Sequence, residues 1–364
     1  MSSPAAATAT PPRRPHTKWA FAVLFGAVGA LVVGLVVLAF VWPIATAAAK
    51  DVPIAISGSS AQVDAVEKAI EAKSPGVVDF VRVAGRDAAV TQIAHREVYG
   101  ALILPAGQGE LPEVLTASAG STSVTQLLGG LATSLQAQLV QQAAAAGAPG
   151  TAVAAIHVTV TDAVPLASTD KNGSGLIAAS FPLVLGGLLG GILVSFLVVG
   201  VVRRLLALVV YAAAAGTVVA LILQTLFGIL QGDFLVNTLA LALSMLATAS
   251  VVVGFNALLG PRGIAVGSVI TMLIGNPIAG ASIPMQFLVG PWGTIGQYFV
   301  PGAASTLIRD LSYFPDADPT RQWLVLAGWA VLGLLLSVTG HFRSQAPVAL
   351  PAGELEQERE PVGA

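Results

Sequence analysis

Long stretches without a single charged side chain limit the fold of this chain more than any other feature. The first runs from Trp19 to Pro43, and the rest follow residue 175, at Leu176–Val202, Leu205–Leu230, Phe234–Leu259, Ile264–Val289 and Trp323–Gly340. An α-helix rises about 1.5 Å per residue, so each run can cross a hydrocarbon layer about 30 Å thick. The sequence therefore predicts an α-helical integral membrane bundle of about six transmembrane helices.

The charge and cysteine content exclude several classes of protein. Only 10% of the residues are charged, whereas soluble domains carry about 25%. The net charge of −2 provides no basic surface for a nucleic acid. The chain has no cysteine, which rules out disulfides, thiolate metal sites, iron–sulfur clusters and a cysteine nucleophile.

The first apolar run has two candidate roles. Ala45-Thr46-Ala47 has the A-x-A form of a signal-peptidase site, but the run is roughly twice as long as the apolar core of a signal peptide. Trp19 and Trp42 lie at its ends, where aromatic residues meet the membrane interfaces. We therefore favour a permanent transmembrane helix at residues 19–43 over a cleaved signal. Residues 1–18 are rich in Ala, Pro and Thr and are predicted to be disordered.

Residues 50–172 differ from the rest, because charged residues return and apolar residues alternate with polar ones. This patterning predicts both strands and amphipathic helices. The predicted strands are Val52–Ser57, Val77–Val83, Val98–Leu104, Glu113–Ala117 and His157–Val164. The predicted helices are Ser60–Lys73, Arg86–Glu97 and Ser121–Ala146. Their alternation predicts a small extracytoplasmic α/β domain, inserted between transmembrane helices 1 and 2.

Basic residues near the helix ends predict the orientation, because they concentrate on the cytoplasmic side. With the N-terminus inside, that side holds Arg13, Arg14, Lys18, Arg203, Arg204, Arg262 and Arg343. The α/β domain then lies outside. Both termini, including a Pro- and Glu-rich tail at 345–364 that is predicted to be disordered, lie in the cytoplasm. Ala, Gly and Val dominate the composition, which is typical of GC-rich bacterial genomes, so we expect a bacterial cell membrane.

The segment Trp292–Ile308 is apolar enough to enter the membrane, but Pro301-Gly302 interrupts it. A seventh transmembrane helix here would place Arg343 and the tail outside the cell. A re-entrant or interfacial helix pair keeps them inside, and broken helices at membrane depth are tolerated when they are buried in protein. We expect the helix pair, within a five-helix transmembrane domain at residues 176–340.

The sequence contains no motif for catalysis or for a cofactor. It has no Walker A pattern and no HExxH, and its four histidines share no ligand spacing. The apolar runs contain no Asp, Glu, Lys or Arg, which argues against a proton-coupled antiporter with carboxylates at the midplane. We therefore expect no enzyme activity, no cofactor and no metal.

Two groups of residues are candidates for helix packing and for recognition of a transported compound. The glycine pairs Gly186/Gly190, Gly187/Gly191 and Gly263/Gly267 are expected to let helices approach closely. Broken helices, side-chain amides and a cation coincide only in the stretch 276–309. Either this stretch shapes a transport pathway, or it is a helix end that seals the bundle. The candidate pathway residues are Asn276, Pro277, Gln286, Gln297, Pro301, Gly302 and Arg309.

Three stretches carry a resemblance to a known family. They are VPIAISG at 52–58, REVYGALILP at 96–105 and IPMQFLVGPWGTIGQYFVPGAASTLIRDLSYF at 283–314. With the order of one helix, an external domain and five helices, the chain resembles the permease subunit of type-2 ABC exporters. More narrowly, it resembles the phage-infection-protein-like branch of that superfamily. In that family a proline-containing segment leads into a Pro-Gly and an arginine before the last span, here Pro284, Pro301-Gly302 and Arg309.

The resemblance implies a permease that moves a lipid-like or amphipathic compound outward, as a homodimer or heterodimer in the lipid bilayer, with a separate ABC ATPase subunit. Two departures weaken the ATPase part. Residues 1–18 are too proline-rich for the amphipathic helix that such exporters place before the first span, and Arg203-Arg204 leaves little room for a coupling helix. The alternative is an accessory membrane protein, a secretion-machine component, scaffold or surface receptor that acts through its external domain.

Overall fold

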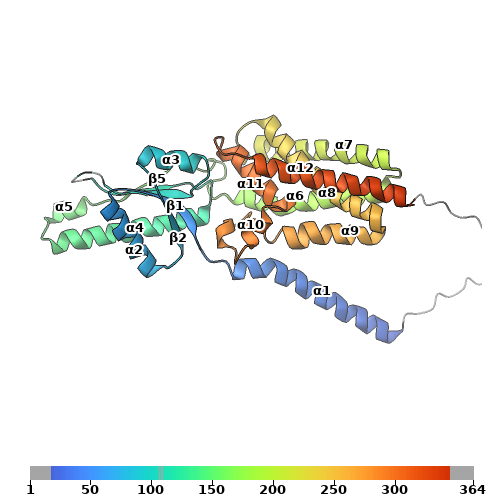
Figure 1. Cartoon of the computed structure of the whole chain (residues 1–364), viewed down its shortest axis with the longest axis horizontal. Coiled ribbons are helices and arrows are strands. Elements are labelled where there is room, and N and C mark those ends of the chain that lie inside the picture. The colour runs from blue at the N-terminus through green and yellow to red at the C-terminus, as the bar shows by residue number, and fades with distance from the viewer. Residues whose placement is uncertain (1–17, 106, 108–109, 345–364) are drawn as a thin grey trace, which may run out of the picture.

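The computed structural model describes residues 18–105, 107 and 110–344, which form an α/β domain and a helical bundle placed end to end (Figure 1). Helix α1 (Trp19–Ala45) runs beside the bundle and diverges from it toward the start of the helix (Figure 1). The predicted disorder of residues 1–17 and 345–364 lies outside the described residues.

Five helices in the described part of the chain are long and apolar enough to cross a membrane. They are α1, α6 (Ser174–Leu197), α7 (Val201–Ala220) with its π-helical continuation η1 (Leu221–Leu226), α8 (Phe234–Leu259) and α12 (Thr320–Ser344). Helix α8 packs against α6, α7 and α12 and is the most buried of the five. These helices confirm a multi-pass bundle, with the α/β domain between its first two long helices.

Glycines set the closest approaches between these helices. Gly187 and Gly191 of α6 face α8, where an added Cβ would overlap the side chain of Thr248 or the backbone of Ala249. The predicted small-residue pairing on α6 therefore lies at a real helix contact. Helices α8 and α12 meet in the same way, at Gly254 and Gly333, which the spacing of glycines along the sequence did not indicate.

The predicted span Ile264–Val289 is shorter in the structure than expected. Helix α9 (Pro261–Ser268) and the π-helix η2 (Val269–Gly275) form one apolar helix that ends before Asn276. Pro277 follows at once, and a proline lacks the N–H that would continue a helix. At about 1.5 Å per residue this helix extends only about 22 Å, which is less than the hydrocarbon thickness.

The stretch after Gly275 folds back as short elements. They are the 3₁₀-helix η3 (Met285–Phe287), α10 (Trp292–Gly296) and α11 (Val300–Tyr313). The segment Trp292–Ile308 is indeed divided between two helices. The division lies at residues 297–299, however, and Pro301-Gly302 lies in the first turn of α11, where a proline costs no hydrogen bond.

The α/β domain contains every strand that the alternation predicts; β1 has the predicted bounds and the other four are shorter. Its elements are β1 (Val52–Ser57), α2 (Ser60–Lys73), β2 (Val78–Arg82), α3 (Arg86–Ala94), β3 (Gly100–Ile103), β4 (Glu113–Thr116), α4 (Thr122–Ala145), α5 (Gly150–Ala154) and β5 (Thr159–Asp162). They build a mixed sheet of order β2-β1-β3-β4-β5, in which only β3 and β4 pair antiparallel. The predicted helices correspond to α2, α3 and α4, and the short α5 was not predicted.

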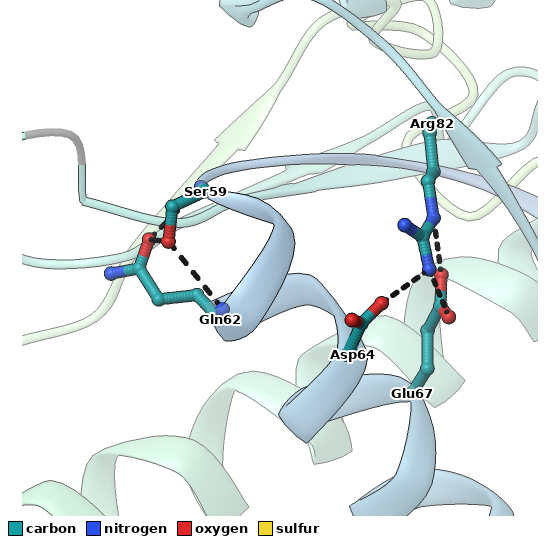
Figure 2. A network of polar contacts seen from close by, with 5 residues as sticks. All are labelled: Ser59, Gln62, Asp64, Glu67 and Arg82. Carbon is teal, nitrogen blue, oxygen red and sulfur yellow. Dashed lines mark hydrogen bonds and ion pairs between the residues drawn. The ribbon is translucent and has the colours of Figure 1, made fainter.

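Helices cover both faces of the sheet (Figure 1). Helices α2 and α4 pack on one face against the side chains of Ile54, Ile56 and Leu102, and α3 packs on the other. Figure 2 shows how α2 is fixed. Ser59 and Gln62 form a capping box at its start, and Arg82 of β2 pairs with Asp64 and Glu67 on its side.

Residues 50–170, expressed without the helices, are expected to fold alone, because both faces of the sheet are covered from within the domain. The product should unfold in one cooperative thermal transition, followed by circular dichroism. A product without a transition would show that the domain needs the bundle to fold.

Candidate functional site

A polar cavity of about 260 Å³ lies where the α/β domain meets the bundle. We call it the interdomain cavity. Its walls come from both parts of the chain, and its lining includes Arg96, Tyr99, Ser118, Gly120 and Ser121 of the domain and Gln286, Gln297, Thr306, Arg309, Asp310 and Gln322 of the bundle. Polar side chains from both parts of the chain therefore meet at this junction.

Arg309 projects from α11 into this junction. Its Nη1 donates to the carbonyl oxygen of Gly120 in the domain at 2.6 Å, and its Nη2 donates to that of Ala281 at 3.2 Å. The side chain is partly buried, and both of its hydrogen-bond acceptors are uncharged backbone carbonyls.

An ion pair between Arg96 and Asp310 joins the domain to α11. Arg96 follows α3 with a positive φ of 59°, and its guanidinium also lies 5.3 Å from the ring centroid of Phe314. Only 5% of the Asp310 side chain is exposed. This contact is the least exposed of the ion pairs in the part of the chain that the structure describes.

Side-chain amides complete the junction. The Tyr99 hydroxyl donates to Oε1 of Gln286 at 2.9 Å, and burial raises the pKa of Tyr99, so the phenol stays neutral. Gln297 donates through Nε2 to the carbonyl of Ala279 at 3.0 Å and accepts from Thr306 at 2.6 Å. Both amides thus hold the loop after Gly275 in place.

A second, smaller cavity lies inside the bundle. This bundle pocket has a volume of about 30 Å³, which is room for about one water molecule. Its polar lining comes from Ser180, Ser244, Thr248, Asn276, Ser305 and Arg309. Ser305 and Arg309 line the interdomain cavity as well, so Arg309 stands between the two.

The predicted pathway residues do not all lie at one site in the structure. Asn276, Pro301 and Arg309 line the bundle pocket, and Gln286, Gln297 and Arg309 line the interdomain cavity. Pro277 and Gly302 line neither of them. Pro277 follows the helix end, and Gly302 packs against Gly296, whose carbonyl oxygen an added Cβ would overlap.

Sequence reasoning missed Arg96 and Tyr99 of the domain, Asp310 of α11 and Gln322 of α12. One signal for Asp310 was present, because an acidic residue directly follows Arg309 in a long apolar region. The other three residues do not adjoin Arg309 in the sequence, so no local pattern links them to it. Within the described ranges, no group of three or more His, Cys, Asp or Glu side chains could hold a metal ion.

Comparison with protein-family models, with curated proteins and with solved structures found no match for this chain.

Proposed function

We propose that the chain is a membrane permease of the type-2 ABC exporter kind, which moves a lipid-like or amphipathic compound outward. The observation that carries this proposal is the position of Arg309, which lines both the interdomain cavity and the bundle pocket. A polar group that leaves the bundle at this end would meet the cavity next. In the proposal the protein works as a homodimer or heterodimer in a bacterial cell membrane, alone or with a separate ATPase subunit.

The proposed topology has six crossings, with both termini in the cytoplasm. The described ends, Trp19 and Ser344, lie at the end of the molecule away from the α/β domain (Figure 1). Arg203 and Arg204 lie in the first turn of α7 and Arg262 in the first turn of α9, near that end, as basic residues on a cytoplasmic side do. The helix Pro261–Gly275 and the folded-back stretch after it together make the fifth crossing, so a re-entrant pair precedes α12.

Single cysteines test this topology, because the chain has none of its own. Cysteines at the exposed positions Lys73 and Asp316 should react with an impermeant maleimide in intact cells. A cysteine at Val199, in the exposed turn between α6 and α7, should react only after permeabilisation. Protection of Asp316→Cys in intact cells would contradict the six-crossing arrangement.

Transport is tested with cells that express the protein and with a panel of detergent-like compounds. Expression should lower sensitivity to at least one compound several-fold, and Arg309→Ala and Asn276→Leu should each remove that protection at unchanged abundance. Arg262→Ala is the matched control, because this exposed arginine lies at the opposite end of the bundle. Unchanged protection in Arg309→Ala, or loss explained by lower abundance, would count against a permease.

One observation favours the accessory role instead. An apolar groove of about 440 Å³ lies between α2 and α4 on the α/β domain, lined by Val66, Ile70, Leu127, Leu131 and Leu135 among others. A scaffold or receptor could hold a partner there without using the bundle. If Leu131→Ser changes the phenotype of cells that express the protein while Arg309→Ala does not, the accessory role is better supported than the permease.

A further inference from the structure

We propose that the interdomain cavity binds the head group of an amphiphile, an oxyanion such as a phosphate ester that also carries a hydrogen-bond donor. This inference rests on the proposed function only in taking the ligand to be the transported compound. Binding itself can be measured without transport.

The charged side chains inside the cavity leave an excess positive charge that an anion would balance. Among the partly or fully buried side chains that line it, Arg96 and Arg309 are cations and Asp310 is the carboxylate. Asp310 is paired with Arg96, whereas the hydrogen bonds of Arg309 go to two backbone carbonyls. The other charged lining groups, at His95, Glu97, Asp318 and Arg321, are exposed to solvent. Two partly buried cations thus share one buried carboxylate, which leaves one positive charge in excess. Charges removed from water are costly unless they are paired.

Arg309 also has the donors that an oxyanion needs. A guanidinium carries five N–H groups in a fixed plane, a geometry that matches phosphate and carboxylate oxygens. The hydrogen bonds to Gly120 and Ala281 use two of them. The remaining three are available at a side chain that lines both cavities.

Gln322 supplies the second, independent feature. It lines the cavity from the first turn of α12 and is only 7% exposed, and its buried Oε1 has no hydrogen-bond partner. An unpaired buried acceptor is unfavourable, so a hydrogen-bond donor on a ligand would stabilise this oxygen. A hydroxyl or ammonium group on the ligand would satisfy it while the oxyanion lies near Arg309.

The shape of the cavity favours an amphiphile over a free ion. Its volume of about 260 Å³ equals about nine water molecules, which exceeds the needs of a bare phosphate. Leu176 and Ile177 of α6 and Ile283 and Met285 of the folded-back stretch add apolar wall next to the polar lining. Leu176 and Ile177 belong to the start of a candidate membrane span, so this wall leads toward the bilayer.

The test uses the full chain in nanodiscs of phosphatidylcholine, alone or mixed with phosphatidylglycerol, whose head group combines an oxyanion with hydroxyl donors. Phosphatidylglycerol should raise the unfolding temperature and should be retained in the purified protein, as measured by mass spectrometry. Arg309→Gln should bind it at least roughly tenfold more weakly, as expected for lost hydrogen bonds to a charged group. The exposed Arg262→Gln variant should bind it as the wild type does.

Gln322→Leu keeps the proposal testable if Arg309→Gln fails to fold. No other side chain hydrogen-bonds to the Gln322 acceptor, so this variant should be at least as stable as the wild type without ligand, yet several-fold weaker in binding. Equal retention of the two lipids, or full retention by Gln322→Leu, would overturn the proposal. Soluble glycerol phosphate should compete only weakly, because it lacks the apolar part that the wall of the cavity would contact. Binding of glycerol phosphate as tight as that of phosphatidylglycerol would overturn the amphiphile. If the lipid binds but expression gives no efflux phenotype, the head-group site is supported and the proposed permease function is contradicted.

Discussion

Gly333→Ala is expected to remove most of the folded protein from the membrane, although it adds only one methyl group. Gly333 of α12 lies against the backbone of α8 at Ser250 and Val251, and an added Cβ would overlap that backbone. On the other side of the same contact, Gly254 of α8 lies against the carbonyl oxygen of Gly333. A backbone cannot turn away as a side chain can, so the two helices must separate.

Overpacking a core typically costs about 1–3 kcal/mol, and a collision with backbone should reach the upper end of that range or exceed it. The measurement is the yield of monodisperse protein after detergent extraction, together with its unfolding temperature. Gly328→Ala is the control on the same helix, because an added Cβ there meets no atom within 4 Å. Equal yields of the two variants would mean that α8 and α12 are packed less closely than the structure shows.

Arg96→Ala is expected to loosen the junction between the domain and the bundle. It leaves the carboxylate of Asp310 without a partner at a position that is only 5% exposed. Removing one partner of a buried ion pair costs about 3–5 kcal/mol, because the other charge stays buried. The unfolding of the full-length protein should then separate into two transitions, since the domain has its own core.

Two further variants test whether the lost ion pair causes the loosening of the junction. Arg86 pairs with Glu113 in the same domain but is 47% exposed, so Arg86→Ala should cost at most about 1 kcal/mol. Adding Asp310→Asn to Arg96→Ala should restore part of the stability, because it removes the unpaired charge. Equal losses in Arg96→Ala and Arg86→Ala would show that the ion pair does not hold the junction.

Local patterns predicted the α/β domain well. Apolar alternation placed β1 at Val52–Ser57 and helix periodicity placed α2 at Ser60–Lys73, both with the bounds that the structure has. Such features depend on neighbours along the chain, so one sequence suffices to find them. The N-cap of α2 is Ser59, whose side chain accepts a hydrogen bond from the backbone N–H of Gln62.

Features that depend on distant residues could not be found in this way. The sequence offered Arg309 as a candidate pathway residue, but it did not show that Arg309 reaches Gly120, 189 positions earlier. The expected span Ile264–Val289 included a break at Asn276-Pro277, but the sequence did not show that the chain folds back after the helix ends at Gly275. Apolar composition measures whether a segment can lie in lipid, and it does not distinguish a straight helix from a folded-back one.

The insertion of the α/β domain into the chain has a mechanical consequence. The chain enters and leaves the domain through two membrane helices, α1 and α6. The α6 connection is firm, because Thr169 and Asp170 bind Gly228 and the start of α6. The side chains of α1 are largely exposed, and the contacts near its end include Phe40 against Phe181 and Trp42 against Trp292. Any swing of the domain about its α6 pivot would thus act as a lever on α1, shifting that helix through the lipid while the other four long helices hold their packing.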